Sequence, residues 1–149
     1  MIKRIVLPIV VVAVAYAVTL VLCGSTGWVH VDFPSFLLVP LLSFAYMAVM
    51  YGWKGVRGAF RAPFADPGVK TELALSVAFF RDLATSFWCF GAMGSCIGLV
   101  EVLRNLTDRT RLGPNLAVAI LTLMYAATFD LVLAHPFLVN ARRKLAAME

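Results

Sequence analysis

Charge is scarce in this 149-residue chain, because only 14% of its residues are Asp, Glu, Lys or Arg, whereas a soluble domain carries about 25%. A water-soluble fold in which 62% of the residues are hydrophobic would expose large apolar patches to water. Intrinsic disorder is also excluded, since a disordered chain needs low hydrophobicity. The three cysteines are too few, and odd in number, for a disulfide scaffold. The composition therefore predicts an integral membrane protein.

Four apolar runs approach the length of about 20 residues that a helix needs to cross the hydrocarbon core. They cover residues 5–23, 33–53, 83–103 and 115–139. Helices are expected because strands exposed to lipid would leave backbone groups unpaired. Lys3 and Arg4 before the first run would also suit a secretory signal, but the run is long for a signal and no small-x-small cleavage site follows. We therefore predict an all-α polytopic membrane protein with four transmembrane helices, the first of them uncleaved.

The distribution of Lys and Arg predicts the orientation of these helices. Ten of the 13 basic residues lie before the first run, between the second and third runs, or after the fourth. The other three are Arg104, Arg109 and Arg111, between the third and fourth runs. Basic loops remain in the cytoplasm, so both termini are expected there. Because the basic residues flank apolar segments, their expected partner is the lipid bilayer and not nucleic acid.

A short basic hairpin is expected between the second and third runs. Two prolines and a glycine lie between positions 62 and 68, and they cannot share one continuous helix. Residues 71–81 then predict a helix that leads into the third span, with Thr71 as its N-cap. The expected domains are residues 1–53, the first helix pair with a short outer loop; residues 54–82, the cytoplasmic hairpin; and residues 83–149, the last two helices with a short basic tail.

Small and polar residues form a stripe along each of the last two spans. At a helical advance of about 100° per residue, the stripe of the third span fills an arc of about 120° and that of the fourth about 80°. The third comprises Gly91, Gly94, Ser95, Gly98 and Glu101, with Asn105 continuing it, and the fourth comprises Asn115, Ala119, Thr122, Ala126 and Asp130. The ionised carboxylate of Asp130 would cost a few kcal/mol or more in lipid. It is therefore expected to face protein or water.

Each stripe also has a purely structural interpretation. Glycines in membrane helices commonly serve close packing, and a threonine hydroxyl can bond its own helix backbone. Glu101 can pair with Arg104 on the next turn, and Asp130 can pair with Arg81 or Arg142. No metal-ligand spacing, phosphate-binding loop or nucleophile motif is present. Nothing in the sequence therefore supports an enzyme, a cofactor or a metal site.

The block from Gly91 to Asp108 resembles the third-span motif of the MotA/PomA flagellar stator subunits. Residues 112–126 are similar to their fourth span, and Pro136 stands where that helix usually carries a proline. Residues 24–39 are similar to the loop and second span of the same family. TolQ and ExbB are more distant relatives with the same channel-forming pair of helices. The resemblance identifies a short form that lacks the large cytoplasmic domain between spans two and three.

The resemblance implies a homopentamer in the bacterial inner membrane, surrounding a dimer of a single-span partner like MotB, ExbD or TolR. The partner would supply the essential carboxylate that takes up a proton or a sodium ion. Residues 83–149 would then form the channel. The ion pathway would be lined by Thr122, Ser95, Asp130, Ala126 and Ala119, with Glu101 and Asn105 at the outer entry and Gly91, Gly94 and Gly98 in helix packing. The driven process would be rotation or movement around the partner.

Four positions depart from the pattern of that family. Leu123 stands where the fourth span usually has a second threonine, and Ser95 replaces the usual threonine of the third span but keeps a hydroxyl. Trp88 replaces a proline that is common at the start of the third span, and Asp130 replaces a residue that is usually small. The carboxylate of Asp130 would therefore add an ion station at the cytoplasmic exit. Two other functions stay open: a non-conducting structural or assembly protein of the same fold, and a small secondary transporter in which Glu101 or Asp130 binds a cation.

Overall fold

The computed structural model describes residues 2–22, 24, 32–65 and 69–148, and this part of the chain is helical apart from short turns and contains no strand. The all-α prediction is therefore confirmed. The elements are α1 (Ile2–Leu22), α2 (Phe33–Arg61), η2 (Ala62–Phe64), α3 (Lys70–Arg104), α4 (Arg109–Phe129), η3 (Asp130–Ala134) and α5 (His135–Ala146).

Three helical stretches are long and apolar enough to cross a membrane. They are Ser35–Phe64, Lys70–Arg104 and Thr110–Ala146, and the described part of α1 adds a shorter apolar helix, Val6–Leu22. These lengths indicate a multi-pass membrane protein. The expected count of four spans, the cytoplasmic termini and the pentamer stay predictions.

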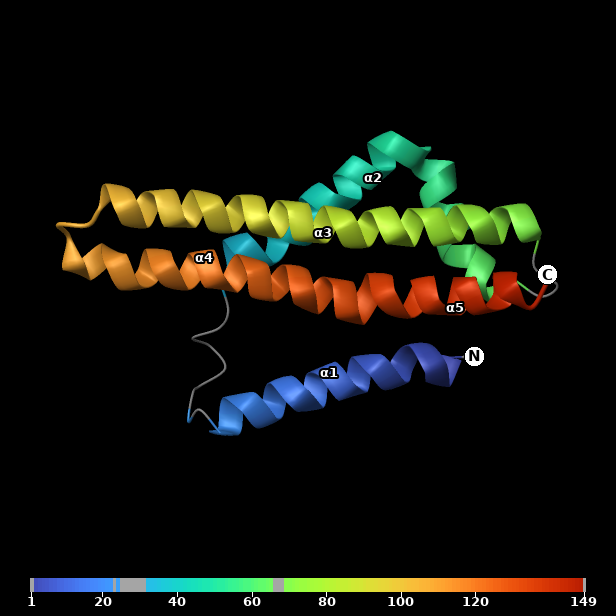
Figure 1. Cartoon of the computed structure of the whole chain (residues 1–149), viewed down its shortest axis with the longest axis horizontal. Coiled ribbons are helices and arrows are strands. Elements are labelled where there is room, and N and C mark those ends of the chain that lie inside the picture. Colours follow the sequence, from blue (N-terminus) through green and yellow to red (C-terminus); the bar gives the residue numbers. More distant parts are fainter. Residues whose placement is uncertain (1, 23, 25–31, 66–68, 149) are drawn as a thin grey trace.

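The longest elements form an antiparallel pair. Figure 1 shows α3 beside a rod made of α4, η3 and α5, with the turn between α3 and α4 at one end of the molecule. The beginning of α1 and the end of α5 lie together at the opposite end (Figure 1). Helix α3 begins at Lys70 and continues without a break through the expected helix over residues 71–81 and the expected third span. Its N-cap is Val69 and not Thr71, which lies within the first turn.

Helix α2 bends sharply at Gly52, where φ is 68° and ψ is 161°. That backbone conformation is accessible almost only to glycine. The bend sends residues 53–61 back across α3 (Figure 1). The buried Ser76 hydroxyl of α3 donates a hydrogen bond to the Ala59 carbonyl at 2.8 Å, which ties the returning segment down. The expected second span, residues 33–53, therefore ends at a bend and not in a straight helix.

Aromatic rings fill the junction between the returning part of α2, α3 and α5. Phe60 contacts Phe79, Phe80 and Phe137 with ring centroids 5.9, 5.0 and 5.4 Å away, and Phe80 stacks on Phe137 at 5.0 Å. Phe79 and Phe80 are fully buried. Lys144 of α5 donates to the Ala65 carbonyl at 3.0 Å beside this cluster. The short link between α2 and α3 is therefore packed against α5.

The expected fourth span, residues 115–139, is interrupted by one π-helical turn. In η3 the His135 N–H donates to the carbonyl of Asp130, five residues back. Pro136 follows directly, and it has no N–H to continue the α-helical hydrogen bonds. Single π turns inside α-helices have one extra residue and often occur at functional sites. Asp130 is the first residue of this turn.

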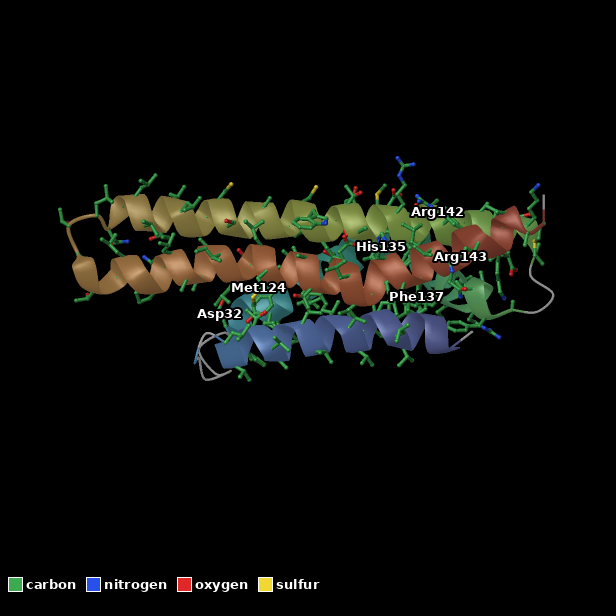
Figure 2. All side chains as sticks on the ribbon, turned by 60° about the horizontal axis from the view of Figure 1, so that its bottom comes forward. Asp32, Met124, His135, Phe137, Arg142 and Arg143 are labelled. Carbon is green, nitrogen blue, oxygen red and sulfur yellow. The ribbon has the colours of Figure 1, made fainter. Side chains whose placement is uncertain are left out.

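Helix α1 packs along η3 and α5. Figure 2 shows α1 beside the α4–α5 rod, with Met124 near its Leu22 end and Phe137 and Arg143 toward its Ile2 end. An apolar cavity of about 560 Å³ separates part of α1 from α2 and α4. Its wall includes Phe36, whose ring meets that of Tyr125 edge-on at 5.5 Å.

Candidate ion pathway between α3 and α4

The two predicted stripes face each other within one chain. A Cβ built on Gly98 would lie 2.8 Å from Ala119 Cβ and 3.0 Å from Ala119 Cα, and one built on Gly94 would lie 3.2 Å from Thr122 Cγ2. Gly91 meets Ala126 in the same way. The glycines therefore let α3 and α4 approach at their backbones, as small residues do in membrane helix pairs.

The two hydroxyl residues of the predicted pathway are both buried in the chain. Thr122 is 3% exposed and Ser95 is 8% exposed. The Thr122 hydroxyl donates to the Ala119 carbonyl at 2.9 Å, the backbone bond that the structural interpretation allowed. A hydroxyl that donates to a carbonyl still has lone pairs to offer a cation.

Thr122 also lines a groove of about 400 Å³. The groove brings together Gly94, Gly98, Glu101, Asn115 and Thr122 from the two stripes. Apolar residues of α3 and α4 line it too, and helix α2 adds a wall that the sequence interpretation did not include: Ser35, Leu38 and Leu42. Their spacing of three and four residues places them on one face of α2. This spacing was the only feature of the sequence that could have indicated the α2 wall. It does not show which helix that face of α2 contacts.

Glu101 and Asn105 lie together at the α3 end of the turn into α4. Glu101 Oε1 pairs with Arg104 Nη1 at 3.0 Å, and the two side chains are 45% and 72% exposed. The Asn105 amide donates to the Glu101 carbonyl at 2.8 Å. The structural alternative for Glu101, pairing with Arg104, is thus present. An exposed pair of this kind contributes little to stability, at most about 1 kcal/mol, so it leaves Glu101 available as an entry residue.

Asp130 has a partner that the sequence interpretation missed. Its Oδ2 accepts a hydrogen bond from the indole Nε1–H of Trp88 at 3.1 Å. Its Oδ1 is buried and has no hydrogen-bond partner. Among the residues whose side chains the structure describes, no ion pair joins Asp130 to Arg81 or Arg142. An indole bond therefore stands in place of the alternative pairing with an arginine, and two of the departures from the family pattern contact each other.

Part of the chain is similar in sequence to known proteins. No family model matches the chain. The chain is 40% identical over 74 residues to Motility protein A of Aquifex aeolicus (strain VF5). The resemblance to the MotA-like family is confirmed. The match covers 50% of this chain and 28% of that relative.

A second match extends the MotA-like similarity. The protein YtxD of Bacillus subtilis (strain 168), which has no characterised function, is 36% identical over 55 residues, or 37% of this chain and 20% of that relative. The matched part of the chain thus spans less than a third of the length of either relative. The named relative is a motility protein. Together with the three long apolar helices, the match supports a membrane protein related to motor stators.

Proposed function

We propose that this chain is the ion-channel-forming subunit of a proton- or sodium-driven, stator-like motor in the bacterial inner membrane. Copies of the chain, five in the expected assembly, surround a dimer of a single-span partner that carries the essential carboxylate. The ion passes the α3–α4 pair of each copy, and its passage moves the assembly around the partner. The observation that carries this proposal is the close apposition of the two stripes, which sets Thr122 against Gly94 with a groove beside them.

The chemistry of these residues supports ion movement. The threonine hydroxyl and the backbone carbonyls near it can replace part of the hydration shell of an ion. Gly94, opposite Thr122, has no side chain to fill the space beside the hydroxyl, so a small ion or a water molecule could approach it there. Glu101 and Asp130 lie at the two ends of these stripes, and ionisable residues within membrane helices typically mark an ion path.

A non-conducting assembly protein is the second candidate function. It is favoured by the same burial of Thr122, because its hydroxyl already donates to the Ala119 carbonyl and because only 3% of the residue is exposed. In this account the two stripes serve only to pack α3 on α4. The two functions differ in one measurable property, ion flux that depends on the Thr122 hydroxyl.

Thr122→Val tests the proposal in vesicles that contain the chain and its single-span partner. Valine keeps the shape and removes the hydroxyl, so we expect ion flux to fall by about tenfold or more, the equivalent of one lost bond to a charged group. Thr128→Val is the matched control: its hydroxyl donates to the Met124 carbonyl at 2.8 Å, but it lines the cavity beside α1. Equal flux in Thr122→Val, Thr128→Val and the unchanged chain would leave only the assembly function.

A further inference from the structure

The contact between Trp88 and Asp130 joins α3 to the first residue of the π turn. The indole N–H lies 3.1 Å from Oδ2, and an indole nitrogen can only donate a hydrogen bond. Trp88 is 46% exposed on the surface of the single chain. The bond therefore fixes one carboxylate oxygen of Asp130, and the π turn sets the direction of the side chain.

The second oxygen of the same carboxylate has no partner. Oδ1 is buried in the structure without a hydrogen bond, and a buried carboxylate held by one neutral donor is costly. A proton on Oδ1 removes the charge and leaves the Trp88 bond on Oδ2 in place. We propose that Trp88 and Asp130 form a carboxyl site that binds a proton and excludes sodium, with Trp88 as the positioning residue.

A proton fits this site better than a metal cation does. A sodium ion must exchange its hydration waters for several oxygen ligands. The side-chain partner of Asp130 is an N–H group, whose positive end repels a cation. Among the residues that the structure describes, no group of three or more His, Cys, Asp or Glu side chains comes together. A proton needs only one lone pair, and the free Oδ1 offers it.

Helix α3 carries the two titratable groups that are nearest to Trp88 in sequence. Asp82 accepts a hydrogen bond from the Tyr51 hydroxyl at 2.5 Å. Cys89 lines the cavity between α2 and α3 together with Asp82 and Tyr51. Both groups therefore face α2. In α4 the charged residues, Arg109 and Arg111, lie in the first turn at the opposite end from Asp130.

The titratable side chains of α5 and α1 that the structure describes contact other parts of the molecule or solvent. His135 and Arg143 line a cavity against α1, and Arg142 lies on the exposed side of α5. Lys144 donates to the Ala65 carbonyl, and Tyr16 of α1 lines the cavity beside α2 and α4. No charged side chain of these helices forms an ion pair with Asp130 in the described part of the chain.

Proton binding at this site is a simple exchange with water. A hydronium ion gives its proton to Oδ1, where an O–H bond forms, and a water molecule is left; the reverse step restores the carboxylate. An N–H bond to a carboxylate is charge-assisted and stronger than one to a neutral carboxyl. Protonation therefore weakens the Trp88 bond, and the emission of this indole reports the state of Asp130.

The test uses the purified full chain in detergent, without its partner. In a Trp28→Phe/Trp53→Phe background Trp88 is the only indole of the three in the sequence. We expect its emission to follow a single-proton titration with pH, and to stay unchanged when sodium replaces potassium at constant pH and ionic strength. Asp130→Asn should abolish the titration because the amide keeps an acceptor for Trp88 but takes no proton. Asp82→Asn, the matched α3 control, should retain it.

Two results would overturn the site: a titration that persists in Asp130→Asn, or an emission change produced by sodium at constant pH. If Asp130→Asn does not fold, infrared spectra of the chain with Asp130 intact decide the question. The band of the protonated carboxyl should then shift in Trp88→Phe, which keeps an aromatic ring and loses the N–H. An unchanged band would contradict the positioning role of Trp88.

This inference rests on the proposed function in one respect, that the ion path reaches Asp130. The two fail separately, because the titration is measured on the chain alone and flux is measured with the partner. A Trp88 titration without Thr122-dependent flux removes the motor function and keeps the proton site. Ion flux that depends on Thr122, together with Trp88 emission that does not change with pH, removes the proton site and keeps the motor function.

Discussion

At the scale of single residues, the contact between α3 and α4 depends on the absence of side chains. Gly98 lies against the backbone of Ala119, and a Cβ there would come within 3.0 Å of its Cα. Backbone atoms cannot move aside as the end of a flexible side chain can. The spacing of the two helices is therefore set by three glycines of α3 and the α4 residues opposite them, Ala119, Thr122 and Ala126.

Gly98→Ala should destabilise the folded chain by about 1–3 kcal/mol, the range for overpacking a close contact. Gly113→Ala is the matched control on α4, because nothing lies within 4 Å of a Cβ built there; it should leave stability unchanged or raise it through helix propensity. Unfolding in mixed detergent micelles measures the difference. Equal stabilities for the two variants would show that the α3–α4 contact is looser than described.

The stripes themselves could be predicted from the sequence, because helical periodicity alone places Gly91, Gly94 and Gly98 on one face. The pairing of Glu101 with Arg104 could also be anticipated from their spacing of three residues. The bond from Trp88 to Asp130 could not, since 42 residues separate the two. Whether two such distant residues come into contact depends on how α3 is rotated relative to the π turn. No local sequence pattern encodes that rotation.

At the scale of elements, the bend of α2 decides how the link to α3 packs. Gly52 adopts φ of 68° and ψ of 161°, and this conformation lets residues 53–61 return toward Phe79 and Phe80. Without the bend a continuous α2 would point Phe60 away from α3. The aromatic cluster and the bond from Ser76 to Ala59 would then be lost together.

Gly52→Ala should destabilise the chain by about 1–3 kcal/mol, because a Cβ makes this backbone conformation strained. The space around Gly52 is open, so the cost is one of backbone conformation alone. Gly58→Ala, in the same helix, has an equally open position without positive φ and should be neutral or stabilising. Hydrogen exchange of residues 53–61 is the measurement, and unchanged protection in Gly52→Ala would contradict the account.

The sequence predicted helices correctly where apolar length decides the structure, and it missed both interruptions. A glycine inside an apolar run equally suits close packing or a bend, so Gly52 gave no clear signal. Pro136 gave no signal of the π turn at Asp130–Ala134, because a proline only removes a backbone donor. The surrounding packing decides how the carbonyls before it are used.

At the scale of the whole molecule, α3 and the α4–α5 rod form the central pair, while α1 lies to one side along η3 and α5 (Figure 1). Apolar length predicted the runs that build this arrangement. It did not predict which helices pair, since nearly every face of an apolar helix suits lipid or protein. The small residues on α3 and α4 explain why these two approach most closely.

The central claim concerns the assembled protein: α3 and α4 of several copies enclose one shared path for the ion. A single-particle image of the chain with its single-span partner, in a lipid membrane, tests it most directly. The account predicts copies arranged about one axis, with α3 and α4 innermost, a lumen at the level of Ser95 and Thr122, and α1 outermost. An assembly in which α1 or α2 lines the axis, or in which Ser95 and Thr122 lie against acyl chains with no lumen between copies, would contradict it.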